Sequence, residues 1–205
     1  MLKIVFTGQS YSGKTTLINE LLKINKEFIS VQESAMQVIG ELKNKMGEEQ
    51  KKWMMENFQQ FQKMIMEKQV FLESQLPKLN EKTILFDRTI LDGLAFCQLR
   101  NVSLTEEMKK LINENFKTYD YVFFCDMLSE FDLREETGRV ITKIDSMKSG
   151  KILEQIYKEY NHPVIHIPEF HNDKEMNLKA RIYFVLSILK ENHPNKLPKK
   201  EPFSL

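Results

Sequence analysis

A chain of 205 residues has the size of one globular domain with a sizeable core. Its 30 basic and 29 acidic side chains leave a formal net charge of +1, so charge alone gives no reason to expect nucleic acid as a partner. The N-terminal residues do not form a signal peptide and no apolar run reaches bilayer length, so we expect a cytoplasmic protein without membrane contact.

The first predicted strand, residues 3–7, leads directly into residues 8–15, which read GQSYSGKT. This segment matches the complete pattern of a phosphate-binding loop: a glycine at each end of a four-residue stretch, then lysine and a hydroxyl residue. Such a loop turns successive backbone N–H groups around a phosphate, and glycine tolerates the close approach and positive φ that this needs. The residues expected to bind the nucleotide are Gly8, Ser10, Ser12, Gly13, Lys14, Thr15 and Thr16.

The residue types at the end of the loop suit a nucleoside triphosphate with Mg²⁺. Lys14, which we expect to be exposed, would place its charge between the β- and γ-phosphates, and the Thr15 hydroxyl would ligate the metal. The helix predicted from Lys14 to Lys23 directs its positive end at the same anion. We expect ATP, and the sequence leaves GTP open.

The next part of the chain holds a short strand, residues 28–32, that ends at Glu33, and then a long helical stretch. One helix is predicted from about Glu48 to Leu76, with an apolar stripe that includes Trp53, Met54 and Phe58. The stripe has two possible uses, packing against the domain or lining a substrate pocket, and we favour packing.

A third strand, residues 83–86, delivers Asp87 and Arg88 to the carboxyl edge of the predicted sheet, where ligands of open α/β folds bind. Asp87 is therefore expected near Mg²⁺, and Arg88 offers a bidentate donor for a phosphate or carboxylate. A surface pair without a ligand is the alternative. Asp92 either ligates substrate or caps the helix over residues 91–99.

Two further strands, residues 121–125 and 163–167, complete a sheet whose strands alternate with helices. This order predicts a three-layer α/β fold with a mostly parallel sheet covered on both faces. Asp126 also follows a strand, but we favour Asp87 for the metal because Arg88 and Thr89 accompany it. Cys97 and Cys125 lie in apolar runs and are expected to be small buried side chains. We assign residues 1–190 to the domain and 191–205 to a polar tail that contains proline and lysine.

From about Leu2 to Leu189 the sequence resembles small AAA-like P-loop ATPase/kinase domains that are related to ribosylnicotinamide kinases and are near relatives of thymidylate and deoxynucleoside kinases. The resemblance rests on the loop, on residues 28–35 (FISVQESA), on residues 84–96 (ILFDRTILDGLAF) and on residues 131–139 (FDLREETGR). It implies a P-loop NTPase fold and an enzyme that transfers phosphate from Mg·ATP to a small nucleoside, nucleotide or ribosylated base.

The resemblance also implies roles for single residues. A carboxylate at Glu33 would face the acceptor hydroxyl, as general base or as a hydrogen-bonding group, although a charge at a helix N-terminus without catalytic use is the alternative. Arg134 or Arg139 would belong to a lid that stabilises the transferred phosphoryl group, but the Asp-Gly pair that usually precedes the arginine is absent here. The loop at residues 168–171 falls where similar folds hold the adenine ring.

A different class of function is a nucleotide-binding regulatory switch, or a slow NTPase without a small-molecule acceptor. A guanine-reading motif or a glutamine placed to orient water would favour it, and the sequence shows neither convincingly. The oligomeric state is left open.

Overall fold

The computed structural model describes residues 1–76, 82–130 and 142–193. Its centre is a sheet of five parallel strands in the order β2-β3-β1-β4-β5. The strands are β1 (Leu2–Gly8), β2 (Phe28–Val31), β3 (Thr83–Asp87), β4 (Tyr121–Cys125) and β5 (Ile165–Ile167). The predicted α/β fold is confirmed, with the correction that β5 begins two residues later than expected.

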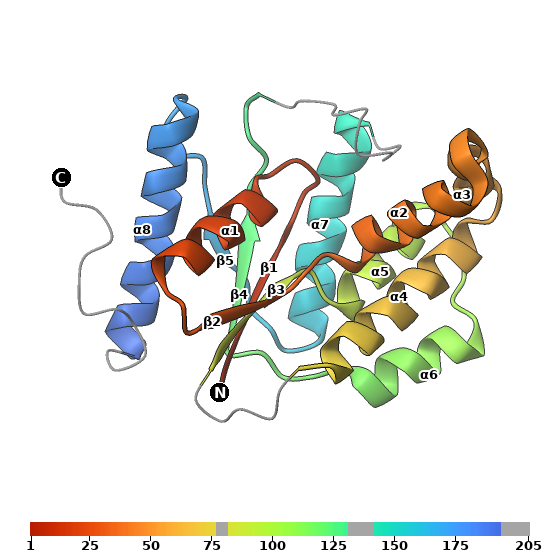
Figure 1. The fold of residues 1–205 in the computed structure, drawn as a ribbon, viewed down its shortest axis with the longest axis horizontal. Helices are drawn as coiled ribbons and strands as arrows, with labels where there is room; N and C mark the ends of the chain where they lie inside the picture. The colour runs from red at the N-terminus through yellow and green to blue at the C-terminus, as the bar shows by residue number, and fades with distance from the viewer. Residues whose placement is uncertain (77–81, 131–141, 194–205) are drawn as a thin grey trace.

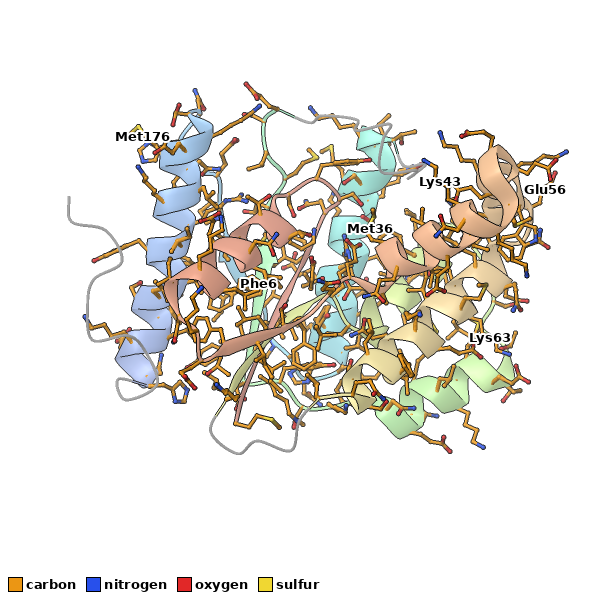
Figure 2. The ribbon with its side chains drawn as sticks, in the orientation of Figure 1. Phe6, Met36, Lys43, Glu56, Lys63 and Met176 are labelled. Atoms are coloured by element: carbon orange, nitrogen blue, oxygen red, sulfur yellow. The ribbon has the colours of Figure 1, made fainter. Side chains whose placement is uncertain are left out.

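One face of the sheet is covered by two helices, α1 (Lys14–Ile24) and α8 (Lys174–Asn192). Alternate strand residues point to this face, because successive side chains of a strand point to opposite sides. Ile4 and Phe6 pack there against Leu17 and Leu21 of α1. The Phe6 ring, in the part of the molecule where α1 crosses the sheet (Figure 2), stacks on Phe123 with 5.5 Å between centroids.

The other face is covered by α5 (Ile90–Leu99) and α7 (Lys143–Glu159), with α4 (Phe58–Ser74) and α6 (Glu106–Asn115) beside them (Figure 1). Val5 and Phe86 point into this second core, where they meet Leu91, Leu153 and Met66. Both cysteines are buried thiols without a disulfide, as predicted. Within the described residues, none of the helices is long and apolar enough to cross a membrane.

The long helix predicted from Glu48 to Leu76 is not one helix. The structure has a 3₁₀ turn at Gly47–Glu49, then α3 (Gln50–Glu56) and α4, with a break at Asn57. Asn57 leaves the helical region at φ −116° and ψ 41°, and its side-chain amide donates to the Trp53 carbonyl at 3.1 Å. Asparagine competes for backbone groups in this way, which favours helix ends.

The break allows α3 and α4 to pack against α2 (Ser34–Met46) as a separate cluster. The cluster contains Met54 and Phe61, which meet Val38 and Leu42. Residues 77–81, 131–141 and 194–205 lie outside the described residues, and α8 continues to Asn192, just before the last of these ranges.

Candidate functional site

The phosphate-binding loop joins β1 to α1 at the carboxyl edge of the sheet. Gly8 has φ +124°, and a Cβ there would lie 2.3 Å from the Cys125 carbonyl oxygen. Gly13 has φ +77°. Both glycines are therefore required by the backbone, one because β4 passes so close and both because of their positive φ. The sequence pattern correctly predicted the loop and the strand and helix that flank it.

Lys14 is buried rather than exposed, which corrects our expectation. Only 5% of its surface is accessible. Its ammonium donates to the Gln9 carbonyl at 2.6 Å and to the Ser12 hydroxyl at 2.9 Å. Burial, with the nearby Arg88 charge, lowers the Lys14 pKa to about 8. The loop therefore holds a desolvated positive charge without a carboxylate hydrogen-bonded to it among the described residues.

Thr15, in the first turn of α1, and Asp87, the last residue of β3, lie side by side. The Thr15 hydroxyl donates to Asp87 Oδ2 at 2.5 Å, because β3 is paired with β1 and ends level with the loop. Asp87 Oδ1 is buried and has no hydrogen-bond partner among the described residues. Burial and the Glu33 charge raise the Asp87 pKa to about 6. A hydroxyl beside an under-satisfied carboxylate is a donor set that fits Mg²⁺ and its water shell.

Asp126, the other strand-end carboxylate, lies apart from this pair. Its side chain is partly exposed and accepts from His166 Nδ1 at 2.9 Å. The pairing raises the His166 pKa against the opposing effect of burial. The geometry therefore favours Asp87 over Asp126 for a role beside Thr15.

Arg88 is the centre of a buried charged cluster. It is 4% exposed, and its guanidinium donates to Glu33 Oε1 at 3.1 Å and to Asp92 Oδ1 at 2.6 Å. Its φ of +73° is unusual for a residue with a side chain. Arg88 Nη2 is buried without a hydrogen-bond partner among the described residues. The alternative of a surface pair is therefore wrong, because Arg88 is buried and binds Glu33, whereas its predicted role as a donor for a phosphate or carboxylate stays a prediction.

Both carboxylate oxygens of Asp92 accept hydrogen bonds from other residues of the protein. Its Oδ1 also accepts from Thr7 at 2.8 Å, and its Oδ2 accepts from the Thr89 backbone N–H at 3.1 Å and from the Tyr157 hydroxyl at 2.8 Å. Thr89 and Asp92 form a capping box at the start of α5. The geometry thus supports the helix-capping role for Asp92, which ties β1, α5 and α7 together around Arg88.

Two cavities meet at Glu33. The first, about 410 Å³, lies over the phosphate loop and is called the donor cavity here. It is lined by Lys14, Thr15, Thr16, Met36, Glu169 and Arg181, among others. Met36, labelled on α2 in Figure 2, contributes to it from the α2 side. The second, about 520 Å³, is called the acceptor cavity, and Glu33 lines both.

The acceptor cavity is mainly apolar, with a few polar groups. Its apolar walls come from Ile39, Met54, Phe58, Phe61, Ile65 and Phe96. Gln62 of α4 also faces it, and Gln62 Oε1 is buried without a partner among the described residues. The apolar stripe of the predicted long helix therefore serves both uses that were considered, packing against α2 and lining a pocket.

Six of the seven predicted loop residues line one of the two cavities, and Gly8 lines neither of them. Ser12, Gly13, Lys14, Thr15 and Thr16 line the donor cavity, whereas Ser10 lines the acceptor cavity. Arg134 and Arg139 lie outside the described residues, so their predicted role is neither supported nor contradicted. Within residues 168–171, Glu169 accepts from the Ser129 N–H at 2.9 Å and faces the donor cavity with His171.

Sequence reasoning missed three residues of this region. Arg181 of α8 lines the donor cavity, Gln62 faces the acceptor cavity, and Tyr157 of α7 anchors Asp92. Gln62 and Arg181 give one usable signal, a polar residue within an otherwise apolar helical stripe, but that signal does not say which cavity the residue would meet. Tyr157 gives none, because its hydroxyl is fully buried in the core.

Residues 3–174 match a family described as AAA domain. The chain belongs to this AAA-domain family. The match runs from β1 to the first residue of α8. Site residues after position 174, such as Arg181, lie outside it. No curated protein matches the sequence.

Solved structures of other proteins have the same fold as this AAA domain. A deoxyadenosine kinase from M. mycoides with products dCMP and dCDP is 18% identical, with a TM-score of 0.64 over 93% of this chain and 100% of that one. A thymidylate kinase from Candida albicans is 16% identical, with a TM-score of 0.60 over 93% and 92%. NadR in complex with NR is 14% identical, with a TM-score of 0.67, and matches 98% of this chain but 53% of its own. The AAA domain therefore has the P-loop kinase fold.

Proposed function

We propose that this protein transfers the terminal phosphate of Mg·ATP to a hydroxyl group of a nucleoside or another ribosylated base. The observation that carries the proposal is the position of Glu33, at the junction of the donor and acceptor cavities and beside the phosphate loop. A binding module needs only the donor cavity. The adjoining acceptor cavity of about 520 Å³ is large enough to hold a nucleoside.

On this proposal, the donor phosphates rest on the loop amides and Lys14. Thr15 and Asp87 would hold Mg²⁺, which when bound neutralises charge on the β- and γ-phosphates. Asp87 acts as an ionised carboxylate there, and its contact with Thr15 keeps both oxygen donors on the same side of the loop. Lys14 donates to the loop carbonyl of Gln9 until phosphate oxygens replace that acceptor.

Glu33 would accept the proton of the acceptor hydroxyl, or hold that hydroxyl by a hydrogen bond. Arg88 fixes the direction of the Glu33 carboxylate, since its Nε donates to Oε1 at 3.1 Å. A carboxylate held by a buried guanidinium loses little conformational freedom when the acceptor arrives, which favours a reactive geometry. Arg134 and Arg139 remain candidates for stabilising the transferred group.

Two features favour a nucleoside over a nucleotide as the acceptor. The acceptor cavity is lined by three carboxylates, on Glu33, Asp92 and Asp145, against two guanidinium groups, on Arg88 and Arg100. Both oxygens of Asp92 and the donors of Arg88 are already engaged within the cluster, apart from Nη2. The slight excess of negative charge disfavours a second phosphate. Among the neighbours, the deoxyadenosine kinase and NadR with NR are named with nucleosides, whereas the thymidylate kinase is named for a nucleotide, so the proposal rests on the charges of the cavity.

The test is phosphate transfer measured by ³¹P NMR from Mg·ATP and from Mg·GTP to a panel of nucleosides, nucleoside monophosphates and nicotinamide riboside. We expect acceptor-dependent transfer that Glu33→Gln reduces at least about a hundredfold. Glu41→Gln is the matched control, because Glu41 follows on α2 but pairs with Lys68 at the surface. Acceptor-independent hydrolysis alone, equal in both variants, would favour a slow NTPase or switch instead.

A further inference from the structure

Arg181 stands out among the residues that face the donor cavity. It comes from α8, is 2% exposed, and its guanidinium binds only backbone carbonyl oxygens. The distances are 2.6 Å from Nη1 to the Ser12 oxygen, 2.9 Å from Nε to the Pro168 oxygen and 3.0 Å from Nη2 to the Asp126 oxygen. No carboxylate of the described residues pairs with it.

With the Ile167 oxygen, which lies 3.4 Å from Nη2, Arg181 binds four carbonyls, and these belong to three different segments around the donor cavity. Ser12 is in the phosphate loop, Asp126 follows β4, and Pro168 follows β5. A buried guanidinium is costly to desolvate, and a core of the same shape could hold an apolar side chain instead. The arrangement is best explained by a need to hold these three segments in a fixed relation.

A second side chain holds the phosphate loop in the same way. Ser146 of α7, fully buried, donates through its hydroxyl to the Ser10 carbonyl at 3.3 Å. Two alternate carbonyls of the loop, those of Ser10 and Ser12, are thus bound by side chains from two different helices. Neither contact involves a residue at a fixed position of the phosphate-loop pattern, which are Gly8, Gly13, Lys14 and Thr15.

Binding these carbonyls fixes the direction of the amide that follows each of them. The described peptide bonds are all trans, so the N–H of a peptide group points opposite to its C=O. Ser146 therefore sets the direction of the Tyr11 N–H, and Arg181 sets that of the Gly13 N–H. Both amides belong to residues with positive φ, 60° at Tyr11 and 77° at Gly13. At a residue with a side chain, such as Tyr11, this conformation persists only where the surrounding structure holds it.

We propose that Arg181, assisted by Ser146, is a positioning residue that presets the phosphate-loop amides for the donor phosphates and joins them to the loop after β5. The proposal rests on the proposed function, in that it assigns the donor cavity to a nucleoside triphosphate. When the amides already point toward the anion site, binding of the anion carries no free-energy cost for reorienting them. Arg181 thus acts on phosphate affinity through the backbone and has no need to touch the phosphates.

The experiment compares Arg181→Met, Arg181→Lys and Ser146→Ala with the wild-type protein. Lys179→Met is the matched control, because it removes an exposed cation from the same helix. Binding of inorganic tripolyphosphate, Mg·ATP and adenosine is measured by calorimetry. We expect Arg181→Met to weaken tripolyphosphate binding at least tenfold, Ser146→Ala about threefold, and the control not at all. Arg181→Lys should recover part of the loss, since an ammonium can bind one or two of the carbonyls.

Adenosine affinity distinguishes positioning from general damage to the structure. It should fall by a smaller factor than tripolyphosphate affinity in the variants that fold, because adenosine carries no phosphate and would meet only the loop after β5. Tripolyphosphate affinity within twofold of wild type in folded Arg181→Lys and Ser146→Ala overturns the proposal, and so does an equal loss for adenosine. If Arg181→Met does not fold, those two milder variants decide. A wild-type protein that binds tripolyphosphate but phosphorylates no acceptor contradicts the proposed function and leaves this test valid.

Discussion

At the scale of single residues, the site keeps two charges in unfavourable surroundings. Lys14 is desolvated and lies near Arg88, and its pKa is lowered to about 8. An unfolded chain holds the lysine proton up to a pKa of 10.5, so folding at neutral pH forces a charged group into a place that disfavours it. On the proposed function, the phosphates of the bound nucleotide would compensate this charge.

Lys14→Met should therefore abolish phosphate binding and at the same time stabilise the ligand-free protein at pH 7. The folded protein binds fewer protons than the unfolded chain between the two pKa values, so wild-type stability rises as pH increases above about 8. The gain of the variant in free energy of unfolding, about 3 kcal/mol before the loss of two hydrogen bonds, should shrink toward pH 10. Urea unfolding at the two pH values measures it, and a destabilised variant at pH 7 would contradict the reasoning.

The affinity for Mg·ATP should depend on pH at both limits. Asp87, with its pKa raised to about 6, must be ionised to hold the metal, and Lys14 must be protonated to bind phosphate. We expect affinity to fall below about pH 6 and above about pH 8, approaching tenfold per unit on each side. Asp87→Asn should weaken binding and make the acidic limb shallower, because only the titration of the nucleotide, which is common to both proteins, would remain. An acidic limb that is equally steep in the variant and the wild type would exclude Asp87 as a source of it.

At the scale of elements, the sequence predicts strands and the phosphate loop well because their signals are local. Buried parallel strands appear as short runs of β-branched and aromatic residues, and the loop has fixed spacing. The break at Asn57 was missed because the apolar stripe continues across it with nearly helical spacing. The contact of Arg88 with Glu33 was missed because it joins residues 55 positions apart, and only the order of β2 and β3 in the sheet brings them together.

The packing of α7 on the phosphate loop gives a prediction at this scale. Gly150 faces Gln9, and a Cβ added there would lie 2.8 Å from Gln9 Nε2 and 2.9 Å from its Cγ. Gly150→Val should push Gln9, and with it the loop, and weaken tripolyphosphate binding about five- to tenfold. Gly40→Val is the control, because no atom lies within 4 Å of a Cβ there. Equal affinity in the two variants would show that α7 does not constrain the loop.

At the scale of the whole molecule, the two layers of helices contribute to different cavities. The donor cavity draws on the phosphate loop, α1 and α8, the acceptor cavity draws on α3, α4 and α5, and α2 lines both. A phosphate-binding loop needs particular residues at fixed spacing, so the loop that lines the donor cavity could be predicted from the sequence. The acceptor side is built from apolar residues that look like any core, which explains why the sequence identified no specific acceptor.

The charges of the acceptor cavity nevertheless make the acceptor class testable. Glu33 and Asp92 surround Arg88, so a monophosphate would approach two carboxylates that share one guanidinium. We expect a neutral nucleoside or cationic nicotinamide riboside to be phosphorylated with a kcat/KM at least about a hundredfold above that of the matching monophosphates. Measurements at raised salt concentration distinguish charge repulsion from steric fit. If repulsion disfavours the monophosphate, screening by salt should bring the two kcat/KM values closer together. Equal kcat/KM values for a nucleoside and its monophosphate would mean that Arg88 releases a carboxylate and binds the phosphate itself.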